Sequence, residues 1–170
     1  MLGEDDGLYV GHPGGMGDRG ANLILQSADV LLSIGSRLDT SLTAFNEQNF
    51  GKNAKKIVID IDRHELDRMK LSQVESMCAC DAGEFIRSLL EAAGDEEALK
   101  AQHAVWAKWN EQGHELRKKY PSVTDVHRNV KGVVSAYYFT ELLCRYTTEA
   151  DVIVPESSGA AGEITYQAFS

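Results

Sequence analysis

The chain has 170 residues, of which 43% are hydrophobic and 25% charged, a composition typical of a globular domain. Its net charge of −9, without any segment that concentrates lysine and arginine, argues against a nucleic-acid partner. No apolar run is long enough to span a membrane, and the first residues do not resemble a secretory signal, so we expect no membrane partner. Three cysteines without a framework spacing indicate a reducing compartment, the cytoplasm.

The first half of the chain is predicted to contain one helix and three strands. Residues 17–28 form the helix, with Asp18 as its N-cap. The apolar segments 30–34 and 57–61 are predicted to be strands buried on both faces, and a short helical piece is expected near residues 43–48. Residues 74–81 give a third, weaker strand. There the period of two places Cys78 and Cys80 on one face, where buried or half-buried thiols are favoured and metal or redox chemistry is the alternative.

The second half begins with two predicted helices. Asp81 caps the first, over residues 81–94, with Gly94 where a C-cap belongs, and the second covers residues 95–119. An extended polar linker with Pro121 follows. Ser135 then caps a third helix, residues 150–157 are predicted to be a buried strand, and a last helix reaches the end of the chain.

Strands that alternate with helices predict an α/β fold with a parallel sheet and crossover connections. The chain begins in a loop and ends within a predicted helix, so we interpret it as a piece of a longer protein. Residues 1–118 would form most of one α/β domain, residues 119–134 a linker, and residues 135–170 the first helix, strand and helix of a second α/β domain.

Two local motifs point to chemistry that the surrounding sequence does not support. The spacing Gly15-x-Gly17-x-x-Gly20 matches the dinucleotide fingerprint, but the preceding segment is a poor strand and no well-placed ribose-binding acid follows. The loop therefore remains either a plain turn or a cofactor contact of another kind. "DRHELDR" lacks the second histidine of a zinc-protease motif, since Arg68 stands there, and is read as an exposed turn.

A longer pattern resembles a known family. Ala21-Asn22, Ala28-Asp29, Gly35 to Asp39 and Ile59 to Asp62 occur in the order and spacing of the central domain of thiamine-diphosphate-dependent enzymes of the acetolactate synthase group. "WAKWNEQGHELRKKYP" resembles the helix that closes this domain, and residues 150–169 resemble the start of the diphosphate-binding domain. The resemblance implies a Rossmann-like parallel sheet with flanking helices, incomplete at its N-terminal side.

The same resemblance implies two cofactor sites. In members that carry FAD, the loops equivalent to Gly35-Ser36-Arg37 and to Asp60 and Asp62 hold the ADP half of the flavin, and the glycine-rich loop lies beside its ring. Many members bind no flavin, and residues 40–46 depart from the flavin-contacting run. The turn Glu156-Ser157-Ser158-Gly159 corresponds to the contact with the diphosphate of thiamine diphosphate, whereas a structural N-cap by Ser157 or Ser158 is the alternative.

The resemblance also sets an expectation for activity. The activating glutamate and the Mg²⁺ ligands of the family are not among these 170 residues, so the chain alone is expected to be inactive and to contain no catalytic residue. Within a full-length enzyme it would use thiamine diphosphate and Mg²⁺ to form or break a C–C bond of a 2-oxo acid, as a homodimer or homotetramer. A noncatalytic module that binds an adenine nucleotide or FAD is the alternative.

Overall fold

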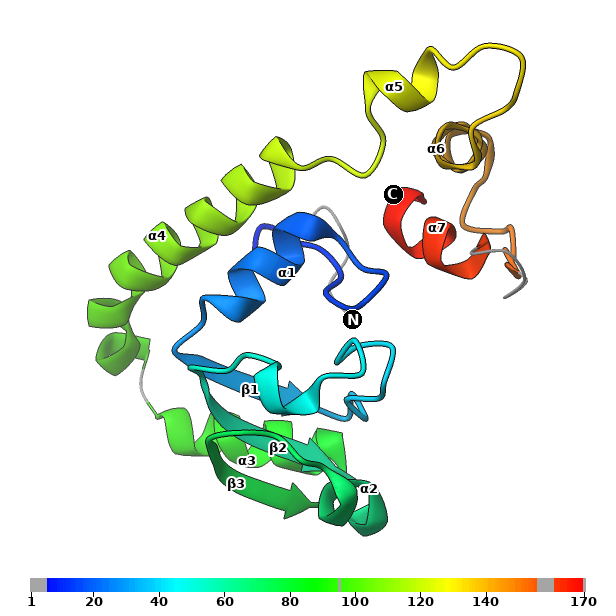
Figure 1. Cartoon of the computed structure of the whole chain (residues 1–170). Helices are drawn as coiled ribbons and strands as arrows, with labels where there is room; N and C mark the ends of the chain where they lie inside the picture. The colour runs from blue at the N-terminus through cyan, green and yellow to red at the C-terminus, as the bar shows by residue number, and fades with distance from the viewer. Residues whose placement is uncertain (1–5, 95, 156–160, 170) are drawn as a thin grey trace.

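The computed structural model describes residues 6–94, 96–155 and 161–169 of the chain (Figure 1). Helices and strands alternate through its first half, and helices alone follow. In chain order the elements are α1 (Arg19–Gln26), β1 (Val30–Ile34), the 3₁₀ helix η1 (Glu47–Asn49), β2 (Lys55–Asp60), α2 (Arg63–Arg68), β3 (Val74–Ala79), α3 (Ala82–Ala93), α4 (Glu96–Lys119), α5 (Asp125–Arg128), α6 (Ala136–Tyr146) and α7 (Ala161–Ala168).

The three strands form one parallel sheet in the order β1-β2-β3, which confirms the predicted α/β class. Leu32 of β1 lies opposite Ile57 of β2, and Ile59 lies opposite Cys78 of β3. Because the strands are parallel and adjacent, their carboxyl ends share one edge of the sheet. The loops that follow β1 and β2 are thereby brought together.

The core forms on one face of the sheet, under the loop that follows β1 and under α2. Its buried side chains are Leu38, Phe50, Val58 and Leu66. Strand β2 is buried as predicted, but the prediction that β1 is buried on both faces is wrong. The other face of β1 is left open, with Val30 59% and Leu32 44% exposed, whereas β2 is contacted by both α2 and α3.

Two of the three predicted N-caps form as expected. The Asp81 carboxylate accepts hydrogen bonds from the backbone amides of Gly83 and Glu84 at the start of α3, and the Ser135 hydroxyl accepts one from Tyr138 in α6. Asp18 occupies the N-cap position of α1, but its carboxylate makes no capping bond. It accepts instead from the His12 amide and the Ser122 hydroxyl, 2.9 and 2.8 Å away, because both donors approach it from outside the helix.

Three local expectations are wrong, and one is confirmed in part. Residues 63–68 are helix α2 and not an exposed turn, since Leu66 is buried beneath it and Asp62 caps it. The short helical piece expected near residues 43–48 is present as the 3₁₀ helix η1, but it begins at Glu47. The linker is not simply extended, because residues 125–128 form α5. Residues 151–155 are not a buried strand: they have no strand partner among the described residues, and Val152 and Val154 are exposed.

Helix α4 packs along α1 on one side of the molecule, and α5, α6 and α7 gather on the other side (Figure 1). The close packing of α1 and α4 depends on Gly20, because a Cβ there would lie 2.9 Å from backbone atoms of Leu116 and Arg117. Within the part of the chain that the structure describes, no helix combines the length and apolar character needed to cross a bilayer.

Candidate functional site

The carboxyl edge of the sheet brings together the residues predicted to contact a nucleotide. Gly35 directly follows β1, and its amide donates to the Ile59 carbonyl of β2 at 2.8 Å. Asp60 ends β2, and Asp62 follows two residues later. Gly35 has a φ of 61°, which a residue with a side chain adopts only at a cost in energy. Polar loops at the carboxyl ends of parallel strands are where open α/β sheets bind ligands.

Arg37 is oriented by a residue that the sequence did not single out as part of this site. Its Nη2 donates to Glu65 Oε1 of α2 at 3.1 Å, and Arg68 Nε donates to Glu65 Oε2 at 2.7 Å. The hydrogen bond from Arg68, and then that from Arg37, lowers the pKa of Glu65. Arg37 itself is 67% exposed, so the face of its guanidinium away from Glu65 is open to a ligand. No local motif links positions 37 and 65, because only the crossover through β2 brings them together.

The two aspartates at the end of β2 have different surroundings. Asp60 is 8% exposed, and its Oδ1 accepts a hydrogen bond from the Asp62 amide at 2.9 Å. Asp62 is exposed and accepts from the His64 amide at 2.8 Å, as the N-cap of α2. Asp62 can therefore reach a ligand in solvent, whereas Asp60 mainly fixes the turn.

The loop after Arg37 is held by Asp39. Asp39 Oδ1 accepts from the Ser41 hydroxyl at 2.6 Å and from the Ser41 and Leu42 amides at 3.0 Å. These bonds, with that from the Ser41 hydroxyl the strongest, lower the pKa of Asp39. The segment contains four non-glycine residues with positive φ, and such strain persists only where surrounding contacts hold it. The four are Arg37, Leu38, Ala44 and Phe45.

The glycine-rich loop is closed by its own hydrogen bonds. The Asn22 side chain accepts from the Gly14 amide and donates to the Gly14 carbonyl, both at 2.8 Å. The Gly15 amide donates to the Ser41 carbonyl, and the Gly17 amide donates to the Gly14 carbonyl. The amides of Gly14, Gly15 and Gly17 are therefore engaged within the protein and do not point to a bound phosphate. Gly17 is needed sterically, since a Cβ would lie 2.4 Å from the His12 carbonyl oxygen.

A cavity of about 370 Å³ separates this loop from α7. Its walls are mostly apolar, and Glu163 Oε2 beside it is buried without a hydrogen-bond partner. Segments far apart in the sequence thus enclose one space. The cavity walls include His12, Pro13, Met16, Leu42, Glu163 and Tyr166.

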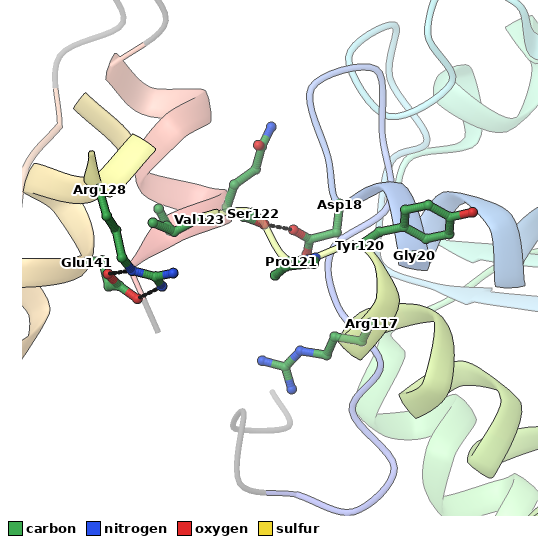
Figure 2. A pocket seen from close by; sticks show the side chains of 11 residues that line it. Asp18, Gly20, Arg117, Tyr120, Pro121, Ser122, Val123, Arg128 and Glu141 are labelled. Carbon is green, nitrogen blue, oxygen red and sulfur yellow. Dashed lines mark hydrogen bonds and ion pairs between the residues drawn. The ribbon is translucent and has the colours of Figure 1, made fainter. Parts of the chain in front are cut away.

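A second cavity, of about 220 Å³, lies where α5–α7 meet the end of α4 (Figure 2). Asp18 reaches across to Ser122 on one side of it, and Arg128 pairs with Glu141 at 2.7 Å on the other. The hydrogen bond from Arg128 lowers the pKa of Glu141. Because Arg128 is paired with Glu141 and Asp18 is hydrogen-bonded to Ser122, we interpret this cavity as a contact between two parts of the chain.

The residues predicted to contact thiamine diphosphate, Glu156, Ser157, Ser158 and Gly159, lie outside the described residues. Helix α7 begins at Ala161, shortly after them. Within the described part of the chain, no three histidine, cysteine or acidic side chains gather as metal ligands.

Comparison with known proteins identifies relatives for most of the chain. Residues 1–89 match the family model described as the central domain of thiamine pyrophosphate enzymes. Thiamine pyrophosphate is a synonym of thiamine diphosphate. The chain is 35% identical over 118 residues to the acetolactate synthase large subunit of Corynebacterium glutamicum, which covers 69% of this chain and 18% of that protein. It is 33% identical over 121 residues to the large subunit of acetolactate synthase isozyme 1 of Escherichia coli, covering 71% of this chain and 20% of that protein.

The chain spans about a fifth of the length of the curated relatives it matches. The matches are to enzymes, so a noncatalytic nucleotide-binding module is not favoured.

Proposed function

The chain belongs to the family of thiamine pyrophosphate enzymes, in which it forms part of the central domain, and we propose that it works within a longer enzyme that depends on thiamine diphosphate and Mg²⁺. That enzyme forms or breaks a C–C bond next to the carbonyl of a 2-oxo acid, as the acetolactate synthase relatives suggest. It acts in the cytoplasm as a homodimer or homotetramer. Apolar side chains of α4 such as Trp106 and Trp109 are exposed, which supports assembly with a further protein surface.

The observation that carries the proposal is the arrangement of the family's sequence pattern in three dimensions. The Ala21-Asn22 pair closes the glycine-rich loop through Asn22, and the segments at Gly35 and at Asp60 lie side by side at one edge of the sheet. Segments that are scattered in the sequence are thus brought together in the fold. Such agreement between pattern and geometry is expected when the match reflects a shared fold.

A flavin is a second, separable part of the proposal. Gly35 permits close approach of the backbone, the Arg37 guanidinium is exposed enough to meet a diphosphate, and Asp62 can accept from ribose hydroxyls. Ser36 and Asp60 border the same edge. The largely apolar cavity beside Pro13 and Met16 is of a kind that could receive the flat ring of FAD. These residues fit the ADP half of FAD better than the glycine-rich loop fits a phosphate.

Thiamine diphosphate is assigned to the segment Glu156-Ser157-Ser158-Gly159, on sequence and family grounds. Its support from the described residues is helix α7, which follows this segment in the chain and faces the glycine-rich loop across the cavity of about 370 Å³. When bound, thiamine diphosphate supplies the carbanion chemistry at the carbonyl of the 2-oxo acid. The chain contributes diphosphate binding, and none of its residues is assigned a catalytic or Mg²⁺-binding role.

The two assignments are separated by two variants of the full-length enzyme. Gly159→Val places a side chain against the diphosphate and should weaken thiamine diphosphate binding by about 1–3 kcal/mol, or about 5- to 150-fold. Arg37→Ala should leave that affinity unchanged and lower flavin retention. Fluorescence titration with thiamine diphosphate and the flavin absorbance of the purified protein provide the two readouts.

The opposite pattern would contradict the division into two sites: a lower thiamine diphosphate affinity in Arg37→Ala and an unchanged one in Gly159→Val. The 170-residue chain alone should consume no pyruvate when thiamine diphosphate and Mg²⁺ are supplied. Turnover by this chain would contradict the assignment of its catalytic groups to the rest of the enzyme.

A further inference from the structure

Two thiols lie next to each other on the outer strand of the sheet. Cys78 belongs to β3 and Cys80 directly follows it, and their sulfur atoms are 3.5 Å apart. The period of two in a strand puts both side chains on one face, as the sequence predicted. Cys78 is exposed and Cys80 is half-buried, so a small ion can reach both sulfurs from solvent.

The spacing of these sulfurs suits a shared metal ion. With a metal–sulfur distance of about 2.3 Å, sulfurs separated by 3.5 Å subtend about 100° at the metal, close to the tetrahedral angle. A disulfide needs sulfurs about 2.05 Å apart, and residues two apart in a strand have Cα atoms about 6.6 Å apart, near the upper limit for that bond. Chelation requires little movement, whereas oxidation requires the strand end to bend.

The surroundings of the pair hold it in place and attract cations. The Cys80 amide donates to the Asp60 carbonyl at 3.1 Å, which ties this residue to the end of β2. The hydrogen bond with Cys78 raises the pKa of Cys80, and the nearby charges of Glu84 and Asp81 add to that effect. Protonated thiols beside carboxylates oxidise slowly, since thiolate is the reactive form, but a dication lowers the thiol pKa and benefits from the same negative charges.

We propose that Cys78 and Cys80 form a two-thiolate site for a thiophilic divalent cation of the Zn²⁺ and Cd²⁺ class. Binding joins one cation to both sulfurs and releases the two thiol protons to solvent, with no change of oxidation state. Since the described residues offer no third ligand of the cysteine, histidine or carboxylate type in a cluster, water completes the coordination. The site is therefore open and exchangeable, and it is independent of the thiamine diphosphate function.

Titration of the reduced chain with Cd²⁺ tests this site through the ultraviolet absorption of the thiolate–cadmium bond. The absorption should saturate at one Cd²⁺ per chain and release two protons per ion into weakly buffered solution. Cys78→Ser and Cys80→Ser should each weaken binding at least about tenfold, because one ligand is lost. Cys144→Ser is the matched control and should bind Cd²⁺ as the parent chain does.

Circular dichroism of each variant and a titration in urea separate a preformed site from loose thiols. Binding should weaken in urea, where the two sulfurs are no longer held together. Equal affinity in urea, unchanged binding by the Cys78→Ser/Cys80→Ser double variant, or loss of binding in Cys144→Ser would each overturn the proposal. The proposal would also be overturned if the reduced chain bound no Cd²⁺ and instead lost the mass of two hydrogens when treated with oxidised glutathione. That result would show that the two cysteines form a disulfide switch.

Discussion

At the scale of single residues, the most unexpected side chain is Lys56. It is fully buried, and its Nζ donates to the carbonyls of Gly51, Ala54 and Ser72 at 2.7, 3.0 and 2.8 Å. Burial lowers the pKa of Lys56, while three carbonyl partners satisfy the three donors of its ammonium group. The side chain thereby links the loop before β2 to the segment before β3.

Lys56→Met should lower the free energy of unfolding by about 1–3 kcal/mol, because it leaves buried carbonyls without a donor. Lys55→Met is the control, since the neighbouring lysine is 65% exposed and pairs with Glu75 only at the surface. Its effect should stay within about 0.5 kcal/mol. Urea unfolding followed by circular dichroism measures both, and equal effects would show that the carbonyl contacts of Lys56 contribute nothing.

At the scale of elements, neighbouring elements decide which segments adopt the secondary structure predicted for them. Strand β2 has a neighbour on each side and adopts its predicted structure, whereas the equally apolar residues 151–155 have no strand partner among the described residues and remain exposed. Helix α5 has only four residues and depends on a capping box at Thr124 and on the pair between Arg128 and Glu141 of α6.

The pair between α5 and α6 predicts a dependence of stability on pH. Because the folded-state pKa of Glu141 lies below its ordinary value of 4.5, the pair stabilises the fold above about pH 4.5 and loses this effect as the pH falls further. Glu141→Gln should therefore cost up to about 1 kcal/mol at pH 7, and the difference from the parent chain should shrink below pH 4.5. Urea unfolding at several pH values tests this, and a difference that grows in acid would contradict it.

At the scale of the whole molecule, the chain consists of a sheet with α1 to α4 and a smaller group of α5 to α7 (Figure 1). Among the described residues, the polar contacts between the two parts include two side-chain hydrogen bonds. The Ser122 hydroxyl donates to Asp18, and the Gln167 side chain donates to the Met16 carbonyl. Cavities of about 220 and 370 Å³ lie between them. A contact of this kind should open more readily than the core of the sheet.

Limited trypsin digestion should first cut after Lys131. This residue is exposed in the irregular segment after α5, whereas Lys118 and Lys119 lie within α4 and Arg128 lies within α5. The released residues 132–170 are too few to keep a core and should be degraded further, while residues 1–131 persist. Lys131→Gln should remove the first cut, and early cleavage within α4 would contradict the division of the chain into these parts.

The sequence by itself determined the elements whose signals are local. Asp81 and Gly94 fixed the ends of α3, Ser135 fixed the start of α6, and the apolar runs gave β1 and β2. The family pattern added the identity of the domain and a set of residues predicted to bind cofactors, of which those at Gly35 and Asp60 are brought together. These features could be predicted because caps, periodicity and motif spacing depend on residues close together in the chain.

Only the tertiary structure decided which residues from distant parts of the sequence contact one another. Glu65 lies in a segment predicted to be an exposed turn, and instead it holds Arg37 at the carboxyl edge of the sheet, while Lys56 lies in the core. Asp18 took the expected cap position but bonds to Ser122, more than one hundred residues away. The exposed face of β1, and the lack of a strand partner for residues 151–155 among the described residues, likewise depend on which elements lie nearby. In each case the outcome depends on which distant segment lies alongside, and a local pattern carries no information about that.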